Sequence, residues 1–371
     1  MTSLLDSAIL WGYSTVANKY FPYMPPIAPS TRPPYTRPRA TGRVTLADVA
    51  LEAGVSPITV SRALRGERAV DVELVARVQA AAQKLGYVPD PAARALASRH
   101  SSHVVVLIPM LSNALFVDLL EAVQRTLRPA GYQMLMGVTH YDSSEEEHLL
   151  REQLLHRPAG LLVTGLERNE ATRALITQSG VPCVHLMEAS GSPGIHSVGF
   201  SQMDASADMT RHLVQRGYRR IAFAAAQLDP RTLQRLAGWR RELTALGLFE
   251  PTREWLNPAP SSMALGALMF EQIMRQQPAV DAIFFCNDDL AQGALLAALR
   301  LGVAVPQRVA IAGFNDLTGS DQMVPALTTV HTPRAEIGRA AATMLLALMG
   351  GGQVESPCVD LGYELLVRAS T

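Results

Sequence analysis

Short apolar segments alternate with helix-like segments through residues 104–371, and this alternation restricts the fold of the 371-residue chain more than any other feature. Strands are predicted at 104–109, 132–138, 160–165, 181–187, 221–226, 282–286 and 309–314, and helices at 116–128, 145–155, 169–179, 204–216, 232–246, 264–276 and 289–301. Near-continuous apolar strands separated by helices are typical of parallel sheets that helices cover on both faces. The repetition of the pattern predicts two such α/β lobes.

The loops after these strands contain the candidate residues for a small-molecule site. In doubly wound sheets, ligands bind beyond the carboxyl ends of the strands. Amide and carboxylate side chains there suit a ligand with neighbouring hydroxyl groups, and an aromatic ring can cover its apolar face. Each polar residue taken alone is more often a helix cap, and Arg235 taken alone is open to interpretation as a surface ion pair. The candidates are Ser112, Asn113, Phe116, His140, Glu188, Arg235, Asn287 and Asp288.

Residues 43–88 predict a separate all-α domain of three short helices. Thr45, followed by Asp48 three residues later, is a capping-box signature at the start of the first helix. Gly54 is expected to end that helix, and Ser56 to cap a second one whose first residue is Pro57. Two short helices joined by a glycine turn form a helix-turn-helix, and its second helix can lie in the major groove of DNA.

The second of these helices has side chains suited to DNA. Arg62 can donate to guanine O6 and N7 through both arms of its guanidinium, and neighbouring hydroxyl groups suit phosphates. Periodicity alone leaves another interpretation open, because any three small helices show it. The predicted DNA-contacting residues of this domain are Thr45, Ser56, Pro57, Ile58, Thr59, Ser61 and Arg62.

Residues 89–103 are predicted to be a hinge and linker. Pro89 and Pro91 break the preceding helix, and Asp90 can cap a new short helix over residues 92–97. A helix this short is marginal in water, so we expect it to form only when it is paired with a twin on DNA. Its candidate DNA contacts are Arg94 and Leu96, and the alternative is a plain linker that carries Leu96 into the next core.

The segment VTLADVALEAGVSPITVSRAL resembles the DNA-binding motif of LacI-type transcription regulators almost position for position. LGYVPDPAARALAS resembles the helix end and hinge that follow in that family, and the resemblance covers about residues 43–371. It implies an effector domain of two α/β lobes, similar to periplasmic sugar-binding proteins. It also implies that Leu96 wedges into the minor groove at the operator centre, that Arg235 of RLAGW grips a sugar, and that Asp288 of CNDDLAQGA binds hydroxyl groups.

Several segments resemble the gluconate-utilisation repressors of that family. They are GYQMLMGVTHYD, LDPRTL, CNDDLAQGA, the end of IAGFNDLTGSDQMVPALTTVHTPR and DLGYEL. This resemblance implies a sugar-acid effector such as gluconate, whose carboxylate needs a cation or a cluster of donors. Arg235, with Arg231 one helical turn earlier, would supply them. The sequence departs from the family at Pro57 and Ile58, where a polar pair is usual, so base contacts from these two positions are in doubt.

A LacI-type regulator is expected to act as a homodimer joined through its effector domains. It would bind a near-palindromic double-stranded operator and block transcription until the effector closes the lobes and releases the DNA. No leucine heptad follows Gly352, which favours a dimer over a tetramer. The alternatives are a different sugar effector, a phosphorylated sugar acid, or a co-repressor that promotes binding.

Other classes of protein lack their signatures in this sequence. There is no GxGxxG, Walker A, HExxH or GxSxG motif, so we expect neither an enzyme nor a cofactor. The three cysteines are too widely spaced for a CxxC metal or redox site. No apolar run is long enough to span a membrane, and no basic region precedes the mildly apolar residues 7–17. We therefore expect a cytoplasmic protein and not a secreted sugar-binding transport protein.

The first 42 residues differ from the rest of the chain. Residues 1–42 contain seven prolines and are predicted to be an extended or disordered leader, with a role as a partner ligand or DNA-contacting arm left open.

The chain is neutral overall, but residues 1–103 carry 12 basic and 7 acidic groups, whereas residues 104–371 carry 21 basic and 26 acidic groups. Residues 43–103 alone hold eight basic and six acidic groups, which predicts only modest affinity for random DNA.

Overall fold

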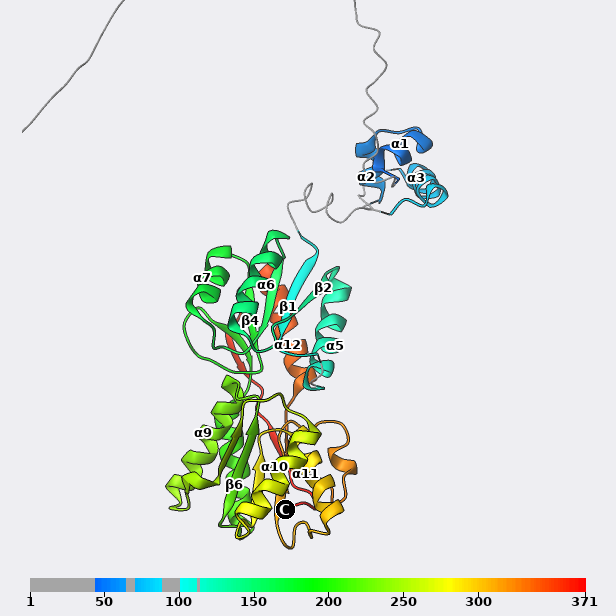
Figure 1. The fold of residues 1–371 in the computed structure, drawn as a ribbon. Helices are drawn as coiled ribbons and strands as arrows, with labels where there is room; N and C mark the ends of the chain where they lie inside the picture. The colour runs from blue at the N-terminus through cyan, green and yellow to red at the C-terminus, as the bar shows by residue number, and fades with distance from the viewer. Residues whose placement is uncertain (1–43, 65–70, 89–100, 112–113) are drawn as a thin grey trace, which may run out of the picture. The chain divides into compact units, whose positions relative to one another are not determined.

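The computed structural model describes residues 44–64, 71–88, 101–111 and 114–371 (Figure 1). The chain divides into two units, Met1–Pro89 and Asp90–Thr371. The predicted leader and the predicted hinge helix with Arg94 and Leu96 lie outside the described residues.

The first unit contains the three predicted helices, α1 (Leu46–Ala53), α2 (Pro57–Leu64) and α3 (Val72–Leu85). The capping box at the start of α1 is confirmed, because the side chains of Thr45 and Asp48 each accept a hydrogen bond from the other's backbone amide. These local bonds satisfy amides that have no partner inside a helix.

A small apolar core joins the three helices. Gly54 has φ 65°, a left-handed conformation that ends α1 and lets the chain turn into α2, as predicted. Asp71 caps α3 by accepting from the amides of Glu73 and Leu74. The buried core residues are Val49, Ala50, Ala53, Val60, Ala63, Val78, Ala81 and Ala82. The helix-turn-helix is therefore held by local caps and one shared cluster.

The second unit contains two sheets of parallel strands, as the alternating pattern predicts. The first has the order β11-β5-β4-β3-β1-β2, and the second has the order β7-β6-β8-β9. The first comprises β1 (His103–Ile108), β2 (Gln133–Val138), β3 (Gly160–Thr164), β4 (Cys183–Leu186), β5 (His196–Gly199) and β11 (Cys358–Asp360). The second comprises β6 (Ile221–Ala226), β7 (Glu254–Asn257), β8 (Ala282–Phe285) and β9 (Ala310–Ala312), beside an antiparallel pair, β10 (Thr329–His331) and β12 (Glu364–Leu366).

Helices cover both faces of each sheet (Figure 1). Those of the first lobe are α5 (Leu115–Leu127), α6 (Ser143–Leu155), α7 (Glu170–Ser179) and α12 (Arg334–Met349). Those of the second lobe are α8 (Gln202–Gln215), α9 (Pro230–Ala245), α10 (Met263–Gln276) and α11 (Asp288–Leu301). Three short 3-10 helices occur at Arg128–Ala130, Pro251–Arg253 and Ser320–Gln322. Among the described residues, no helix is long and apolar enough to cross a membrane.

The pleat of β1 explains why its residues are apolar without interruption. Val104 and Val106 belong to the core that α5 and α12 cover, whereas Val105 and Leu107 belong to the cluster on the side of α6 and α7. Successive side chains of a strand point to opposite faces, so a strand covered on both sides has no polar face.

The chain passes between the lobes three times, which the sequence pattern does not predict. The crossings follow β5, β10 and β11, so the late helix α12 packs on the first lobe against α5. Each lobe is thus built from segments far apart in the sequence. The loops at the carboxyl ends of both sheets face the space between the lobes, where the candidate site lies.

The packing of α8 against α9 gives a stability prediction. A methyl group at Gly238 would lie 2.1 Å from the carbonyl oxygen of Met203, a backbone atom that cannot move aside cheaply. We expect Gly238→Ala to lower the free energy of unfolding by about 1–3 kcal/mol or more, measured by chemical denaturation. Gly191→Ala is the matched control, because its methyl group would meet no atom within 4 Å. Equal stabilities of the two variants would contradict the observed packing.

Candidate effector cleft and DNA-reading helix

The start of α2 combines helix caps with exposed side chains. The Ser56 hydroxyl accepts from the amide of Thr59 at 3.2 Å and lies 2.8 Å from its hydroxyl, so it is occupied as a cap. Pro57, Ile58 and Arg62 are exposed, and the Ile58 side chain is 66% accessible. Thr45 and Ser61 also lie on this unit, the first as the exposed cap of α1 and the second half-buried. An exposed isoleucine at the tip of such a helix is suited to a thymine methyl group.

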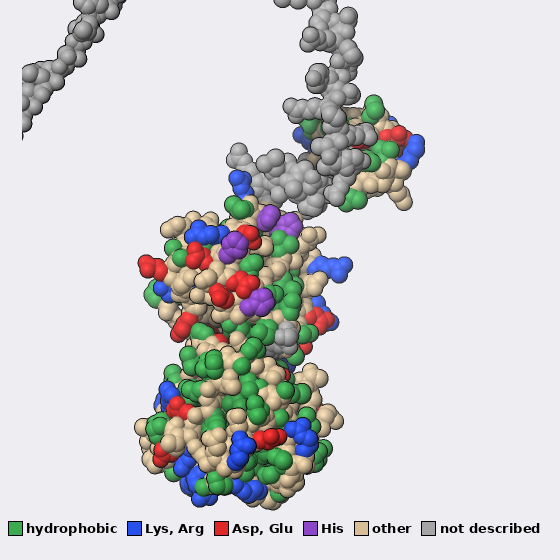
Figure 2. All heavy atoms as spheres, viewed as in Figure 1, with side chains coloured by type: hydrophobic (Ala, Val, Ile, Leu, Met, Phe, Trp, Pro, Cys, Tyr) green, Lys and Arg blue, Asp and Glu red, His purple; other side chains and the backbone are tan. Residues whose placement is uncertain are grey.

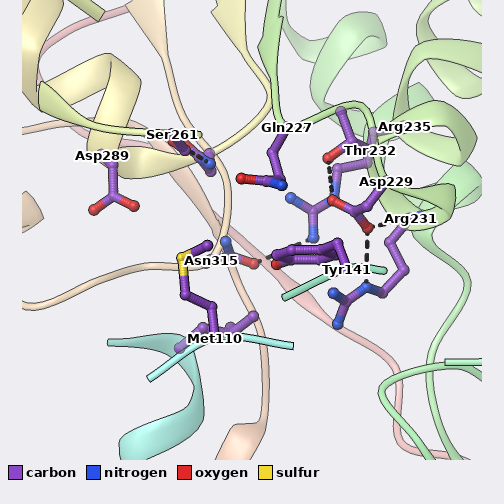
Figure 3. Close-up of a pocket in the computed structure, with 12 residues that line it drawn as sticks. Met110, Tyr141, Gln227, Asp229, Arg231, Thr232, Arg235, Ser261, Asp289 and Asn315 are labelled. Carbon is purple, nitrogen blue, oxygen red and sulfur yellow. Dashed lines mark hydrogen bonds and ion pairs between the residues drawn. The ribbon is translucent and has the colours of Figure 1, made fainter. Parts of the chain in front are cut away.

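Two adjoining cavities lie between the lobes of the second unit, and they share Tyr141, Asp229 and Arg231. The first cavity is lined by Met110, Leu115, Tyr141, Gln227, Asp229, Arg231, Thr232, Arg235, Ser261, Asn287, Asp289 and Asn315 (Figure 3). The second lies against the loops after β1, β2, β3 and β4, and its polar lining includes Thr139, Ser143, Thr164, Glu167 and Glu188. Both cavities therefore lie at the carboxyl ends of parallel strands. Of the candidate residues, Ser112 and Asn113 lie outside the described residues.

Arg235 is buried at the wall of the first cavity and is held by the start of α8 and by the loops after β8 and β9. Its Nε donates to Gln202 at 2.9 Å, its Nη1 donates to the carbonyl of Cys286 at 2.6 Å, and its Nη2 is 3.4 Å from Asn315 Oδ1. The guanidinium lies over the ring of Phe314, 3.9 Å from the centroid. Burial lowers the pKa of Arg235 to about 10, so it stays cationic at neutral pH. The residue is a fixed positive group in the cleft.

Arg231, one helical turn earlier, lies where the two cavities meet. Its Nε is 3.3 Å from Asp229 Oδ1, and its guanidinium faces the rings of Phe116 and Tyr141 at about 6 Å. Figure 3 shows Asp229, Thr232 and both arginines gathered on one side of the first cavity, with Tyr141 beside them. Burial opposes ionisation of Asp229, but the charges of Arg231 and Arg235 outweigh it and lower the pKa of this carboxyl.

Glu188 lies in the second cavity and is 97% buried, at 3% exposure. Its Oε2 accepts from Gln234 at 3.3 Å, and its Oε1 has no hydrogen-bond partner among the described residues. Burial raises the pKa of Glu188, and the charge of Arg231 opposes part of that rise. The structure therefore brings Glu188, Arg231 and Arg235 to one cleft.

Of the Asn287-Asp288 pair after β8, only Asn287 lines a cavity, although both were predicted to bind the effector. Asn287 lines the first cavity and caps α11, whereas Asp288 is fully buried and lines neither cavity. Its carboxylate accepts from the Leu317 amide at 2.7 Å and from the hydroxyls of Ser320 and Thr329 at 2.9 and 2.7 Å. These bonds hold the loop after β9, so the expected contact with ligand hydroxyls is not supported. The next residue, Asp289, lines the first cavity instead, and its carboxylate has no hydrogen bond to a described residue (Figure 3).

Two further candidates lie beside the cleft without lining it. His140 is exposed, and its Nδ1 is 2.9 Å from Glu145 Oε2, so it interacts with the start of α6. Phe116 is 1% exposed and lies behind Arg231. Their neighbours Tyr141 and Leu115 line the first cavity in their place. In both cases a residue next to the predicted one lines the cavity.

Three non-glycine residues that line the first cavity have a backbone with positive φ. Tyr141, Gln227 and Asn315 line the first cavity with φ of 61°, 65° and 106°, values that non-glycine residues rarely adopt. Such conformations are typical of ligand sites, where the surroundings hold them. Sequence reasoning missed these three residues together with Asp229, Thr232, Ser261 and Asp289. The sequence contains a pattern that could have identified Asn315 and Asp229 as candidates, because each polar side chain follows a predicted buried strand.

Arg334 connects the loop after β9 to the first lobe. It donates to the carbonyl of Asn315, and its Nη2 is 3.0 Å from Asp118 Oδ2 on α5. Asn315 is thus in contact with Arg235 on one side and with a residue bound to the first lobe on the other. A ligand that moves Asn315 would act on a contact between the lobes.

Comparisons with known proteins agree with both halves of this architecture. Residues 45–90 match the family model described as bacterial regulatory proteins, lacI family, and residues 210–371 match a periplasmic binding protein-like domain. The chain is 54% identical over 333 residues to the HTH-type transcriptional regulator GntR of Pseudomonas aeruginosa, covering 90% of this chain and 97% of that protein.

Solved structures give the same result. The transcription regulator GntR from Chromobacterium violaceum is 48% identical, with a TM-score of 0.71, over 72% of this chain and 98% of that one. A Lac repressor dimer bound to operator and the anti-inducer ONPF is 26% identical, with a TM-score of 0.78, over 88% of this chain and 99% of that one. The chain therefore belongs to the LacI family and is a DNA-binding transcriptional regulator.

Proposed function

We propose that this regulator is a repressor of sugar-acid utilisation genes, released from its operator when a sugar acid such as gluconate enters the cleft. The observation that carries the proposal is the pair of buried arginines, Arg231 and Arg235, in a cleft whose other polar lining consists of amide, hydroxyl and carboxylate groups. A carboxylate pairs well with a guanidinium, and the polar groups suit hydroxyls. The resemblance to proteins named GntR supports the same effector class.

The DNA half of the proposal rests on the exposed face of α2. Arg62 is the cation of that helix, and Ile58 would contact an apolar base edge such as a thymine methyl. We propose a homodimer on two half-sites, as in the Lac repressor structure described as a dimer bound to operator. A near-palindromic operator follows from twofold symmetry. The proposal places the protein in the cytoplasm, with no catalytic activity and no cofactor.

Release from selected DNA tests the proposal. Full-length protein would select its sites from a random duplex library, and fluorescence anisotropy would then measure affinity for those sites with and without gluconate. We expect enriched sites with two symmetric halves and a weaker affinity when gluconate is present. Tighter binding with gluconate would favour a co-repressor instead, and no enrichment would contradict the proposed operator recognition.

Substitution of Arg62 tests which residue reads the bases. Arg62→Ala is expected to cost about 1–3 kcal/mol at one base position, because a bidentate contact to guanine would be lost. Anisotropy titrations on the selected site and on single-base variants measure this. Arg77→Ala, an exposed arginine of α3, is the matched control for a change in net charge. A uniform loss over all base variants would show a phosphate contact and not base readout.

A further inference from the structure

Two buried polar atoms from side chains of opposite charge are left unpaired at the second cavity. The Nη1 of Arg231 and the Oε1 of Glu188 are both buried, and neither has a hydrogen-bond partner among the described residues. The residues themselves are 6% and 3% exposed, and both line the second cavity. An unpaired buried charged group is costly, so native structures usually supply a partner. A ligand in this cavity would supply both.

The two atoms require different partners. The Arg231 nitrogen only donates, so it needs an acceptor, and an anionic one gives the strongest bond. The Glu188 oxygen, when ionised, only accepts, so it needs a donor such as a hydroxyl. A carboxylate with a hydroxyl on the adjoining carbon provides the two groups side by side. A neutral polyol offers the arginine only an uncharged, weaker acceptor, and an acid without that hydroxyl leaves the glutamate oxygen without its donor.

The charges of the cleft favour Arg231 as the position of the ligand carboxylate. The nitrogens of Arg235 are already within hydrogen-bond distance of Gln202, Cys286 and Asn315. Arg231 is the one arginine or lysine among the residues that line the second cavity, which also include Glu167 and Glu188. An anion placed deeper in that cavity would meet like charges, which repel. The hydroxylated chain of the ligand suits those acceptors instead.

We propose that Arg231 and Glu188 form a specificity pair that recognises a 2-hydroxycarboxylate head group, the carboxylate accepting from Arg231 and the adjacent hydroxyl donating to Glu188. This inference rests on the proposed function, because it names the chemistry that the cleft selects within the sugar acids. It assigns the discrimination between ligands to their carboxylate end, which would lie in the second cavity beside these two residues.

Isothermal titration calorimetry of the full-length protein with three ligands tests the pair. Gluconate has both groups, 2-deoxygluconate lacks the adjacent hydroxyl, and glucitol lacks the carboxylate. We expect 2-deoxygluconate to bind about 10–100-fold more weakly than gluconate, the size of one hydrogen bond to a charged group. Glucitol should bind more weakly still, because the Nη1 of Arg231 would have only an uncharged acceptor.

Two variants then separate the roles of the two side chains. Glu188→Met should reduce the preference for gluconate over 2-deoxygluconate to less than about threefold, because the hydroxyl no longer has its acceptor. Arg231→Met should remove most of the preference for gluconate over glucitol. Arg241→Met on the outer side of α9 and Glu170→Met at the exposed start of α7 are matched controls that should keep both ratios.

The outcomes distinguish this inference from the proposed function. If the wild-type protein binds gluconate and 2-deoxygluconate equally, or if folded Glu188→Met keeps the wild-type ratio, the specificity pair is wrong while the sugar-acid effector stands. If no sugar acid binds and none releases DNA, the proposed effector class fails, and the pair with it. The wild-type ratios decide the matter even if Arg231→Met does not fold.

Discussion

Arg235→Met is expected to abolish the response to effector while leaving operator binding intact. The side chain lines the first cavity and connects three segments of the chain through Gln202, the Cys286 carbonyl and Asn315. Removing one partner of buried charged hydrogen bonds costs about 2–5 kcal/mol, so effector affinity should fall by roughly 30-fold or more. The helix-turn-helix lies in a separate unit and should keep its affinity for DNA.

The measurement is operator anisotropy over a range of gluconate concentrations, with Arg240→Met as the matched control. Arg240 lies on the same helix, is partly exposed and pairs with Glu254 at 2.5 Å. Its loss should leave the gluconate response unchanged. A folded Arg235→Met protein that still releases DNA at the wild-type gluconate concentration would contradict the assignment of the cleft.

Asp288→Ala is expected to lower the free energy of unfolding by about 3 kcal/mol or more. The carboxylate accepts from the Leu317 amide and from the hydroxyls of Ser320 and Thr329, and all three donors would be left unpaired in a buried place. Asp289→Ala is the matched control, since this neighbour faces the cavity without a described partner. We expect Asp289→Ala to keep stability and to weaken effector binding, as measured by denaturation and calorimetry.

The pH dependence of stability provides a second readout for Asp288. Burial raises the pKa of this carboxyl to about 6 from an ordinary value of 3.8. The folded state therefore binds the proton more tightly than the unfolded state, and this contribution to stability is lost as pH rises from about 4 to about 6. Relative to Asp288→Asn, the wild-type protein should lose up to about 3 kcal/mol over that interval and then stay level. A constant difference would contradict the raised pKa.

Local patterns were sufficient for the three helices of the first unit, for most longer elements of the second unit and for the fold class, but not for the late helix α12. The cap at Thr45, the left-handed Gly54 and the start of α2 at Pro57 depend on residues within four positions of one another, and all three were predicted. The uninterrupted apolar strands likewise reflect burial on both faces of a sheet. Short strands such as β5 and β10 escaped prediction, because their three or four residues carry too little pattern.

Assignment of individual side chains to the cleft required the tertiary structure. Asp288 and Asp289 are chemically identical neighbours. The carboxylate of Asp288 accepts hydrogen bonds from residues 29 to 41 positions later in the chain, whereas Asp289 lines the cavity. Their side chains point about 100° apart around a helix, and only the position of the loop after β9 decides which is buried.

The helix-turn-helix, the two parallel α/β lobes and the polar residues at the strand ends could be predicted from the amino-acid sequence, since they depend on contacts between near neighbours and on apolar periodicity. In contrast, the folded arrangement of the chain was needed to find that Arg231 and Glu188 each keep one buried polar atom unpaired in the same cavity. That arrangement depends on two lobes whose chain crosses between them three times, and contacts over such separations leave no trace in local spacing.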